Sequence, residues 1–375
     1  MLPVKIRKTL FLVYNKARIA TIDKLLFPGL HLPQSAFFLY KRVCPLKDYN
    51  IRLDDSGDRF INKLLSYWNS WTEEEYIYVH TCGGLIEPAH GWHITNEGKL
   101  NYYSLGLSRA PHQKKPSFIN LKKKKEVKKV NKLISLRDTG EENYFHFYND
   151  VLAKLFFLEE NGFRLSAYHV LITEKLAQKP FFSFYKENHP QLKNINWLVQ
   201  GNDYITADEI VFAKPETHRM DLLPKLVAPF KLKAAQQKEE GNKKIFLSRS
   251  SKRLRFIENM NELEPLLNQY GFNIADADDL MLTEQITLFG KLIYLIGIHG
   301  AGFANLLYSD NIEVLIEIFP PATEQWLPFH YGLMAKQMGI RYIPVMGCPS
   351  KKSYTGGFYL STSALNAALK QVAVA

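Results

Sequence analysis

A histidine and two glycines interrupt an apolar stretch of the sequence. The turn reads His299, Gly300, Ala301 and Gly302, after the apolar run 292–298 and before a short helical pattern at 303–308. A helix start offers free N–H groups and a favourable dipole to an anion, and glycines let the anion approach the backbone. The turn therefore predicts a phosphate site, with a tightly packed strand–helix turn as the structural alternative. It is neither a GxGxxG fingerprint nor a Walker loop.

A second group of basic residues follows another expected strand end. Arg249 ends the expected strand 243–249, and Lys252 and Arg255 lie within the next six residues. Guanidinium and ammonium groups at the carboxyl end of a strand suit a phosphate. A solvated basic loop is the alternative. Two anion-suited strand ends in the same half of the chain favour one shared ligand.

Carboxylates and a histidine supply candidates for proton transfer. His146 and Asp150 are four residues apart on an expected helix, so they share a face, and Glu142 precedes them. Such a histidine is a base, a substrate ligand, or a partly buried ring bonded to Asp150. Glu317 stands near the end of an apolar strand and needs a partner if buried, either ribose hydroxyls or a lysine or arginine.

Two series of alternating strands and helices must position these residues. One begins at residue 133 and one at residue 243, and the total of 375 residues suits two domains. Strand–helix alternation predicts parallel sheets covered on both faces. We therefore expect an α/β protein with domains at 1–235 and 236–375, the last helix being a candidate to return to the first domain. Residues 1–135 show little pattern apart from a strand near 76–84.

Composition narrows the choice of partners. The net charge is +11, and residues 113–132 hold nine lysines and one glutamate. A solvated surface, an anionic lipid or a phosphorylated acceptor explains this segment; nucleic acid is disfavoured because the segment lacks a stacking platform. Three scattered cysteines favour a reducing compartment. The basic N-terminus lacks a cleavable signal, and no window reaches the roughly 20 apolar residues of a membrane span.

Together these motifs resemble glycosyltransferase family 61, whose members include bacterial capsular polysaccharide transferases and plant xylosyl- and arabinosyltransferases. The resemblance covers about residues 133–345 and rests on NYFHFYNDVLAKLFFLE, FLSRSSKRLRF, LIGIHGAGFANLLYSD and VLIEIFPP. Phe147 and Phe303 replace a tryptophan and a leucine that are frequent there. The resemblance implies a GT-B-like fold, with two Rossmann-like domains and parallel sheets facing a cleft, and inverting transfer from a nucleotide-diphosphate sugar.

The resemblance also implies roles for residues. Arg249, with Lys252 or Arg255, would neutralise the diphosphate, which the backbone of the turn at 299–302 would also bind. Asn305 follows in the same motif, Glu317 would lie near the ribose, and His146 would face the cleft. His146, Asp150 and Glu142 are the candidate bases. No metal and no cofactor is expected.

The sequence thus predicts a bacterial-type transferase that builds a surface polysaccharide on a glycan or lipid-linked acceptor. Its expected location is the cytoplasm, with contact to the inner face of the cell membrane through the lysines and the basic N-terminus. Three alternatives remain: a non-catalytic protein that binds a nucleotide sugar or a polyanion, a nucleic-acid-binding protein that uses the lysine-rich segment, and a different nucleotide-dependent enzyme on the same fold.

Overall fold

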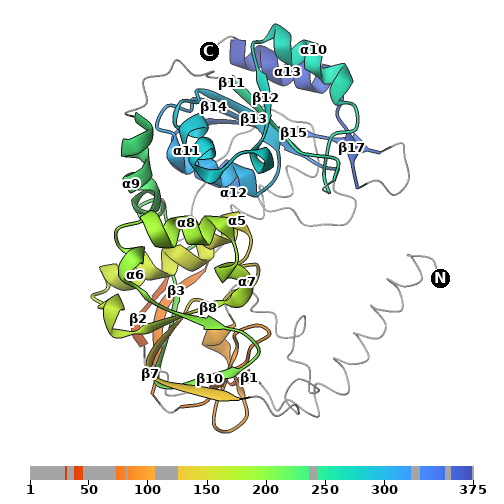
Figure 1. The fold of residues 1–375 in the computed structure, drawn as a ribbon. Coiled ribbons are helices and arrows are strands. Elements are labelled where there is room, and N and C mark those ends of the chain that lie inside the picture. The colour runs from red at the N-terminus through yellow and green to blue at the C-terminus, as the bar shows by residue number, and fades with distance from the viewer. Residues whose placement is uncertain are drawn as a thin grey trace, which may run out of the picture. The chain divides into compact units, whose positions relative to one another are not determined.

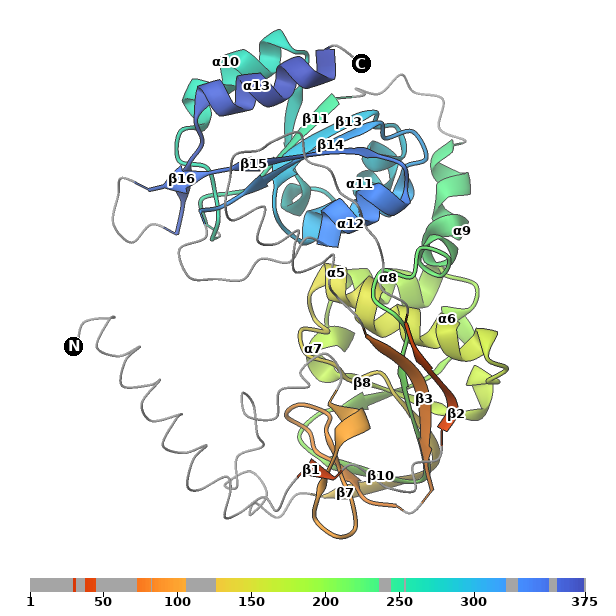
Figure 2. The same ribbon diagram turned by 180° about the vertical axis from the view of Figure 1, so that it is seen from behind.

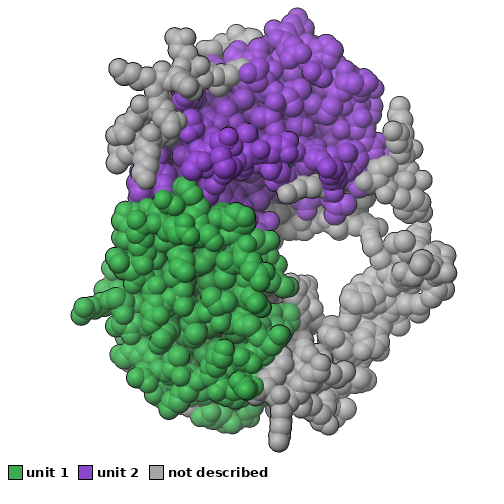
Figure 3. Space-filling view, viewed as in Figure 1, with its two compact units in different colours: residues 1–42, 74–142, 150–215 green, residues 43–73, 143–149, 216–375 purple. Residues whose placement is uncertain are grey.

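The computed structural model describes residues 30–31, 38–44, 73–81, 83–105, 126–235, 244–252, 254–321, 330–350 and 356–373. They fall into two compact units (Figure 3): unit 1 is 1–42, 74–142 and 150–215, and unit 2 is 43–73, 143–149 and 216–375. The predicted boundary after residue 235 falls at a segment, 236–243, outside the described residues. The basic N-terminus and residues 113–125 of the lysine-rich segment also lie outside the described residues.

Unit 2 is built on a five-stranded parallel sheet. The strands are Lys244–Ser248 (β11), Asn273–Asp276 (β12), Tyr294–Ile298 (β13), Val314–Phe319 (β14) and Arg341–Met346 (β15), in the order β12-β11-β13-β14-β15. Every residue of β14 is buried, as expected of a strand covered on both faces. The predicted parallel sheet is confirmed for this half of the chain.

Helices cover both faces of this sheet (Figures 1 and 2). Met260–Gln269 (α10) and Thr362–Ala373 (α13) lie on one face, and Leu282–Gly290 (α11) and His330–Gln337 (α12) on the other. Leu263, Leu267, Leu365 and Leu369 of α10 and α13 join the strands in one apolar core. The last helix therefore packs within unit 2. Other elements of unit 2 are Tyr144–His146 (α5), Leu223–Ala235 (α9), the short strands Cys348–Pro349 (β16) and Phe358–Tyr359 (β17), and the 3₁₀ helices Ala277–Asp279 (η6) and Ala301–Tyr308 (η7).

Unit 1 contains a mixed sheet, which corrects the expectation of a parallel sheet here. Val127–Ser135 (β7), His169–Thr173 (β8), Asn196–Gln200 (β9) and Tyr204–Lys214 (β10) run parallel in the order β10-β7-β8-β9. Glu74–His80 (β3) and Leu85–Ile86 (β4) pair antiparallel with β10. His93–Ile94 (β5) and Leu100–Asn101 (β6) continue from β4 antiparallel. Leu30–His31 (β1) pairs with β6 in parallel, and Phe38–Val43 (β2) pairs with β3. Tight turns join β4, β5 and β6, and such turns allow only antiparallel neighbours.

Part of the lysine-rich segment belongs to β7. Lys128, Lys129 and Lys132 form ion pairs with Asp203, Asp208 and Glu209, at 3.2, 2.8 and 3.6 Å. These acidic residues lie on or beside the neighbouring strand β10. The described lysines are therefore locally neutralised, which weakens their use as a surface for nucleic acid or another polyanion.

The helix predicted after residue 143 is present but interrupted. It runs as α5, a π-helical segment Phe147–Leu152 (η3) and the α-helix Ala153–Glu160 (α6). Gly162 follows the end of this helix in the left-handed conformation, at a φ of 82°. The two compact units divide inside the π segment, so His146 groups with unit 2 and Asp150 with unit 1. π turns of this kind are frequent at functional sites.

The remaining helices of unit 1 are short: Glu174–Ala177 (α7), Pro180–Asn188 (α8), and the 3₁₀ turns Tyr102–Ser104, Leu165–Ala167 and Leu192–Asn194. α7 starts directly after β8, where Thr173 caps it by accepting from the Leu176 N–H at 3.0 Å. Within the described residues, no helix combines the length and the apolar character that crossing a bilayer requires.

Candidate functional site

The chain order of the unit 2 sheet reverses between β11 and β13. In open parallel sheets, ligands bind beyond the carboxyl ends of strands at such a reversal. Arg249 follows β11 and the turn at 299–302 follows β13, so both predicted anion-binding features meet here. A Cβ added to Gly300 would lie 2.5 Å from a terminal nitrogen of Arg249, which shows that the guanidinium lies directly against the glycine.

The two other glycines of this region are explained by packing. A Cβ on Gly302 would lie 3.0 Å from a methyl carbon of Leu247, and one on Gly297 would lie 2.9 Å from the Leu247 Cβ. These glycines let the strand–helix turn pack on β11. Of these three glycines, Gly300 is the one that lies against a cation. We therefore retain Gly300 alone as the glycine that would let a phosphate approach the backbone.

His299 belongs to a buried hydrogen-bonded group. Its Nδ1 lies 2.5 Å from Oε1 of Glu317, and the Tyr342 hydroxyl donates to Oε2 of Glu317 at 2.6 Å. Glu317 is fully buried and His299 is 5% exposed. Both carboxylate oxygens are thus occupied from within unit 2, which corrects the expected partners of Glu317, ribose or a basic residue. Burial and Glu317 raise the pKa of Tyr342 well above its ordinary value, so its phenol stays protonated and can donate.

Tyr331 on α12 connects the basic residues with this group. Its ring centre lies 5.6 Å from that of His299. Burial and the Glu317 carboxylate raise the pKa of Tyr331, while the charges of Arg249 and Arg255 oppose the increase, so both arginines lie within electrostatic reach of its hydroxyl. Arg255 has a left-handed backbone, at a φ of 67°, and its N–H donates to the Gly356 carbonyl at 2.7 Å. Lys252 is exposed in the turn between the two arginines.

Asn305 has a structural role in this arrangement. Its side chain is fully buried, accepts from the Tyr144 hydroxyl and donates to Gln285 Oε1, both at 2.8 Å. Tyr144 and Tyr148 share a short hydrogen bond, and the hydroxyls of Tyr148 and Tyr308 lie 2.9 Å apart. The predicted substrate contact of Asn305 is therefore replaced by a link between α5 and η7. This link fixes the start of the histidine-bearing helix to the glycine turn.

His146 lies in a cluster of histidines that we call the histidine cluster: His146, His218 and His330. The ring of His146 is 6.4 Å from that of His330, and His218 Nε2 lies 2.7 Å from His330 Nδ1. Burial and the imidazoles of His218, His146 and His299 hold the pKa of His330 well below its ordinary value, so His330 is neutral near pH 7. Of the residues that the structure describes, no group has an arrangement suited to holding a metal ion.

His218, His330, Tyr331 and Tyr342 were missed in the sequence. Tyr342 is the second residue of β15, where the sequence pattern does not separate it from its neighbours, and His218 lies in a loop. The pair His330-Tyr331 opens a helix, and two polar rings beside the apolar residues 333–335 are the signal in the sequence that marks this site. Only the fold brings the Tyr331 ring near His299 and the Tyr342 hydroxyl to Glu317, and pairs His218 with His330.

The two other predicted proton-transfer residues lie in unit 1. Asp150 is 5% exposed within the π segment. Glu142 is exposed and lines a pocket of about 490 Å³ beyond the carboxyl ends of β7, β8 and β9. Residues 137–142, 173–175 and 200–202 form most of this pocket, with residues 88–90 on one side. We call it the unit 1 pocket.

A buried ion pair lies in the wall of the unit 1 pocket. Arg137 Nε donates to Oε1 of Glu141 at 2.9 Å, and both side chains are almost fully buried. The guanidinium also donates to Gln200 and, at 3.2 Å, to the Pro88 carbonyl. Burial raises the pKa of Glu141 to about 7, although Arg137 and Lys154 oppose this shift. A carboxyl group that titrates near pH 7 in a pocket marks a candidate functional site.

The raised pKa of Glu141 predicts that the folded state becomes less stable as the pH rises. Since the folded pKa lies above the ordinary value, the folded state holds a proton that the unfolded state releases between pH 4.5 and 7. Relative to Glu141→Gln, wild type should lose about 3 kcal/mol of unfolding free energy across this window. Urea unfolding at pH 4.5, 6, 7 and 8 measures this difference. Glu187→Gln, at an exposed site on α8, should show none, and a constant difference for Glu141→Gln would contradict the assignment.

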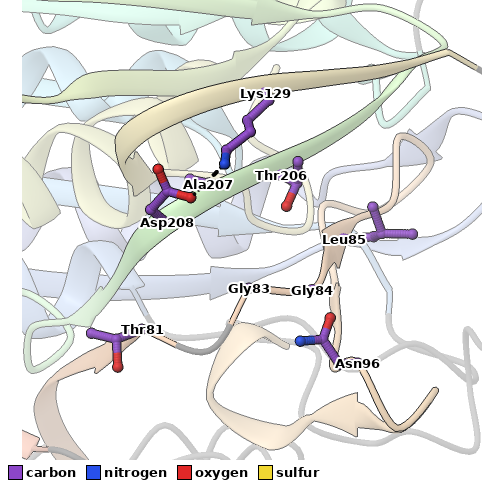
Figure 4. A pocket seen from close by; sticks show the side chains of 9 residues that line it. All are labelled: Thr81, Gly83, Gly84, Leu85, Asn96, Lys129, Thr206, Ala207 and Asp208. Atoms are coloured by element: carbon purple, nitrogen blue, oxygen red, sulfur yellow. Dashed lines mark ion pairs between the residues drawn. The ribbon is translucent and has the colours of Figure 1, made fainter.

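A second pocket of unit 1, of about 700 Å³, has less chemistry to offer (Figure 4). It is lined by residues including Thr81, Asn96, Lys129, Thr206 and Asp208, and its two charged side chains form an ion pair at 2.8 Å. None of the candidate residues from the sequence lies in it. The chemistry-bearing residues therefore concentrate at the strand ends of unit 2 and in the unit 1 pocket.

Comparison with known proteins gives consistent results. Residues 144–316 match the family model described as Glycosyltransferase 61. The chain is 29% identical over 98 residues to alpha-1,3-arabinosyltransferase XAT2 of Oryza sativa subsp. japonica, covering 25% of this chain and 17% of the relative. It is 28% identical over 95 residues to alpha-1,3-arabinosyltransferase XAT3 of the same plant, covering 24% and 16%.

The chain thus spans less than a fifth of the length of these relatives. The matched residues include His146, Arg249 and His299, while Glu142 and Glu317 lie just outside the matched range. The family model supports glycosyltransferase family 61 for the region 144–316, and both relatives are glycosyltransferases by name.

Proposed function

We propose that the protein is an inverting glycosyltransferase that moves a sugar from a nucleotide-diphosphate donor to a glycan or lipid-linked acceptor. The observation that carries this proposal is the contact of Arg249 with Gly300 at the strand-order reversal of the unit 2 sheet. It joins a guanidinium, a glycine and a helix start, which is the chemistry that a diphosphate requires. The site lies in the region similar to glycosyltransferase family 61.

The proposed reaction explains why cations are needed there. An acceptor oxygen attacks the anomeric carbon from the face opposite the leaving group, the bond to the phosphate oxygen breaks, and a base takes the acceptor proton. Negative charge then grows on the departing diphosphate. Arg249 and Arg255 would stabilise this charge, with the N–H groups of residues 300–302, and Lys252 would contact the outer phosphate. In this scheme the protein's own donors neutralise the diphosphate without a metal or a cofactor.

The buried group behind the turn would hold His299 in place. With Oε1 of Glu317 as the acceptor, His299 donates from Nδ1, and Nε2 is the ring atom left for a ligand. We therefore assign Glu317 and Tyr342 as positioning residues.

His146 is the first of three proposed bases. It is partly exposed and lies in unit 2 beside His330, which stays neutral and does not add a positive charge at pH 7. Asp150 is buried and Glu142 is exposed at the unit 1 pocket, so both rank behind His146.

The finer features of the proposal rest on the resemblance. They are a GT-B-like fold and a role in surface polysaccharide synthesis. A cytoplasmic location, with the lysine-rich segment and the basic N-terminus on an anionic membrane, rests instead on composition and charge. The two relatives are arabinosyltransferases by name, which favours a pentose donor over a hexose donor.

Turnover of a nucleotide sugar tests the proposal. Purified protein is incubated with nucleotide-activated pentoses and hexoses in the presence of EDTA, and release of the nucleoside diphosphate is followed. We expect release with one donor class, lowered at least tenfold in His146→Ala. Binding of a nucleotide sugar without any release, even with a glycan mixture as acceptor, would favour a non-catalytic binding protein.

A further inference from the structure

The unit 1 pocket contains a carboxylate oxygen that has no partner. Glu141 is 3% exposed and lines the pocket. Its Oε1 is bonded to Arg137, but its Oε2 has no hydrogen-bond partner among the residues that the structure describes. A buried acceptor without a donor is unfavourable, and such groups in native proteins call for an explanation. A donor supplied by a ligand would remove this deficit.

The charges around Glu141 limit the charge that a ligand of this pocket can carry. Four carboxylates line the pocket, at Asp138, Glu141, Glu142 and Glu174, against two cations, at Arg137 and Lys175. Arg137 is already committed to Glu141, Gln200 and Pro88, and Asp138 pairs with Lys154 at 2.7 Å. With Arg137 and Lys154 used inside the pocket wall, Lys175 is the lining cation left to meet an anionic ligand, against the carboxylates of Glu142 and Glu174.

A cationic ligand is also disfavoured. Arg137 and Lys154 both act on Glu141 electrostatically, so a further positive charge would be repelled close to Oε2. A neutral donor remains, and a hydroxyl is one. The lining residues Thr173 and Asn202 add a hydroxyl and an amide group that can bind sugar hydroxyls. The amide of Gln200 is already bonded to Arg137 and to the carbonyls of Ile86 and Asp203.

We propose that the unit 1 pocket binds a neutral, hydroxyl-rich sugar unit, one of whose hydroxyls donates a hydrogen bond to Oε2 of Glu141. That this sugar belongs to the acceptor rests on the proposed function; that the pocket binds a sugar does not. The pocket lies beyond the carboxyl ends of three adjacent parallel strands, where ligands of such sheets bind.

Saturation-transfer NMR on the full chain tests this site. The probes are methyl glycosides of a neutral pentose and a neutral hexose, with a methyl glucuronide and methyl glucosaminide as anionic and cationic controls. We expect binding of a neutral glycoside at pH 8, about tenfold weaker in Glu141→Gln. Glu187→Gln, the same change at an exposed site outside the pocket, should bind as wild type does.

The pH dependence provides a second readout that a purely structural role would not produce. Affinity for the neutral glycoside should rise from pH 6 to 8 in wild type, as Glu141 ionises, and stay flat in Glu141→Gln. The variant is the control for the other groups that face this carboxylate or line the pocket: His90, Arg137, Asp138, Glu142, Lys154, Glu174 and Lys175.

The outcomes separate the two proposals. No saturation transfer from either neutral glycoside, binding of the charged glycosides alone, or equal affinity in Glu141→Gln would overturn the pocket assignment. Nucleoside diphosphate binding is measured on the same samples. If that binding is absent while the glycoside binds through Glu141, the proposed function fails and the sugar site stands.

Discussion

Arg249→Ala should weaken binding of a nucleoside diphosphate by about 30- to 150-fold. The guanidinium lies against Gly300 at the strand ends, where it would donate charge-assisted hydrogen bonds to the diphosphate. Loss of hydrogen bonds to a charged group weakens the free energy of binding by about 2–3 kcal/mol, which corresponds to this factor in Kd. Isothermal titration calorimetry in EDTA measures the change, and kcat/KM for donor turnover should fall at least as much.

Two further variants control for a general effect of charge or folding. Arg341→Ala removes an exposed arginine at the start of β15, the opposite end of the same sheet, and should leave affinity within about twofold. Gly300→Ala keeps Arg249 but places a methyl group 2.5 Å from its guanidinium, so it should also weaken binding. Equal effects of Arg249→Ala and Arg341→Ala would show that net charge alone attracts the nucleotide.

Glu317→Ala should lower the unfolding free energy of the protein by about 2–5 kcal/mol, because two buried donors, on His299 and Tyr342, lose their acceptor. That is a large share of the stability of a typical domain. Glu317→Gln should be milder, since its amide oxygen accepts from one partner and the Tyr342 hydroxyl can accept from its N–H group. Urea unfolding followed by circular dichroism measures all of these changes.

Glu313→Ala is the matched control for Glu317. Glu313 directly precedes the same strand and also accepts from a tyrosine, Tyr294, at 3.2 Å, but it is exposed. Its loss should change stability by less than about 1 kcal/mol. If the two alanine variants unfold alike, the buried group does not stabilise unit 2.

The sequence predicted the unit 2 framework well, for a physical reason. Strands β11, β13 and β14 are apolar runs that end in glycine, proline or polar residues, and the helices between them show clear periodicity. Local patterns of this kind determine which segments become strands and helices. They also led to Arg249 and the turn at 299–302 as neighbours, since parallel strands end at the same sheet edge.

The structural roles of Asn305 and Glu317 could not be predicted from the sequence, because they depend on tertiary contacts. Asn305 and Glu317 suit ligand binding by residue type, but Tyr144, Gln285, His299 and Tyr342 occupy their polar atoms. Those partners come from distant segments that no spacing rule connects.

Tertiary structure also explains why the sequence did not predict the burial of Glu141, the π segment and the antiparallel strands of unit 1. Glu141 and Glu142 are adjacent in sequence, yet only the fold buries the first and exposes the second. The π segment shifts the face on which residues after His146 lie, so the i, i+4 rule that paired His146 with Asp150 does not strictly apply there. Apart from β3, near which a strand was predicted, the antiparallel strands β4, β5 and β6 have two residues each, too few to show a period.

The most direct test of the central claim is a crystal structure of the protein with the nucleoside diphosphate that it binds most tightly. The account predicts the diphosphate beyond the ends of β11 and β13, with its oxygens within hydrogen-bonding distance of Arg249 and of the backbone N–H groups at 300–302. A nucleotide bound in the unit 1 pocket, or in unit 2 away from Arg249, would contradict the donor site proposed here.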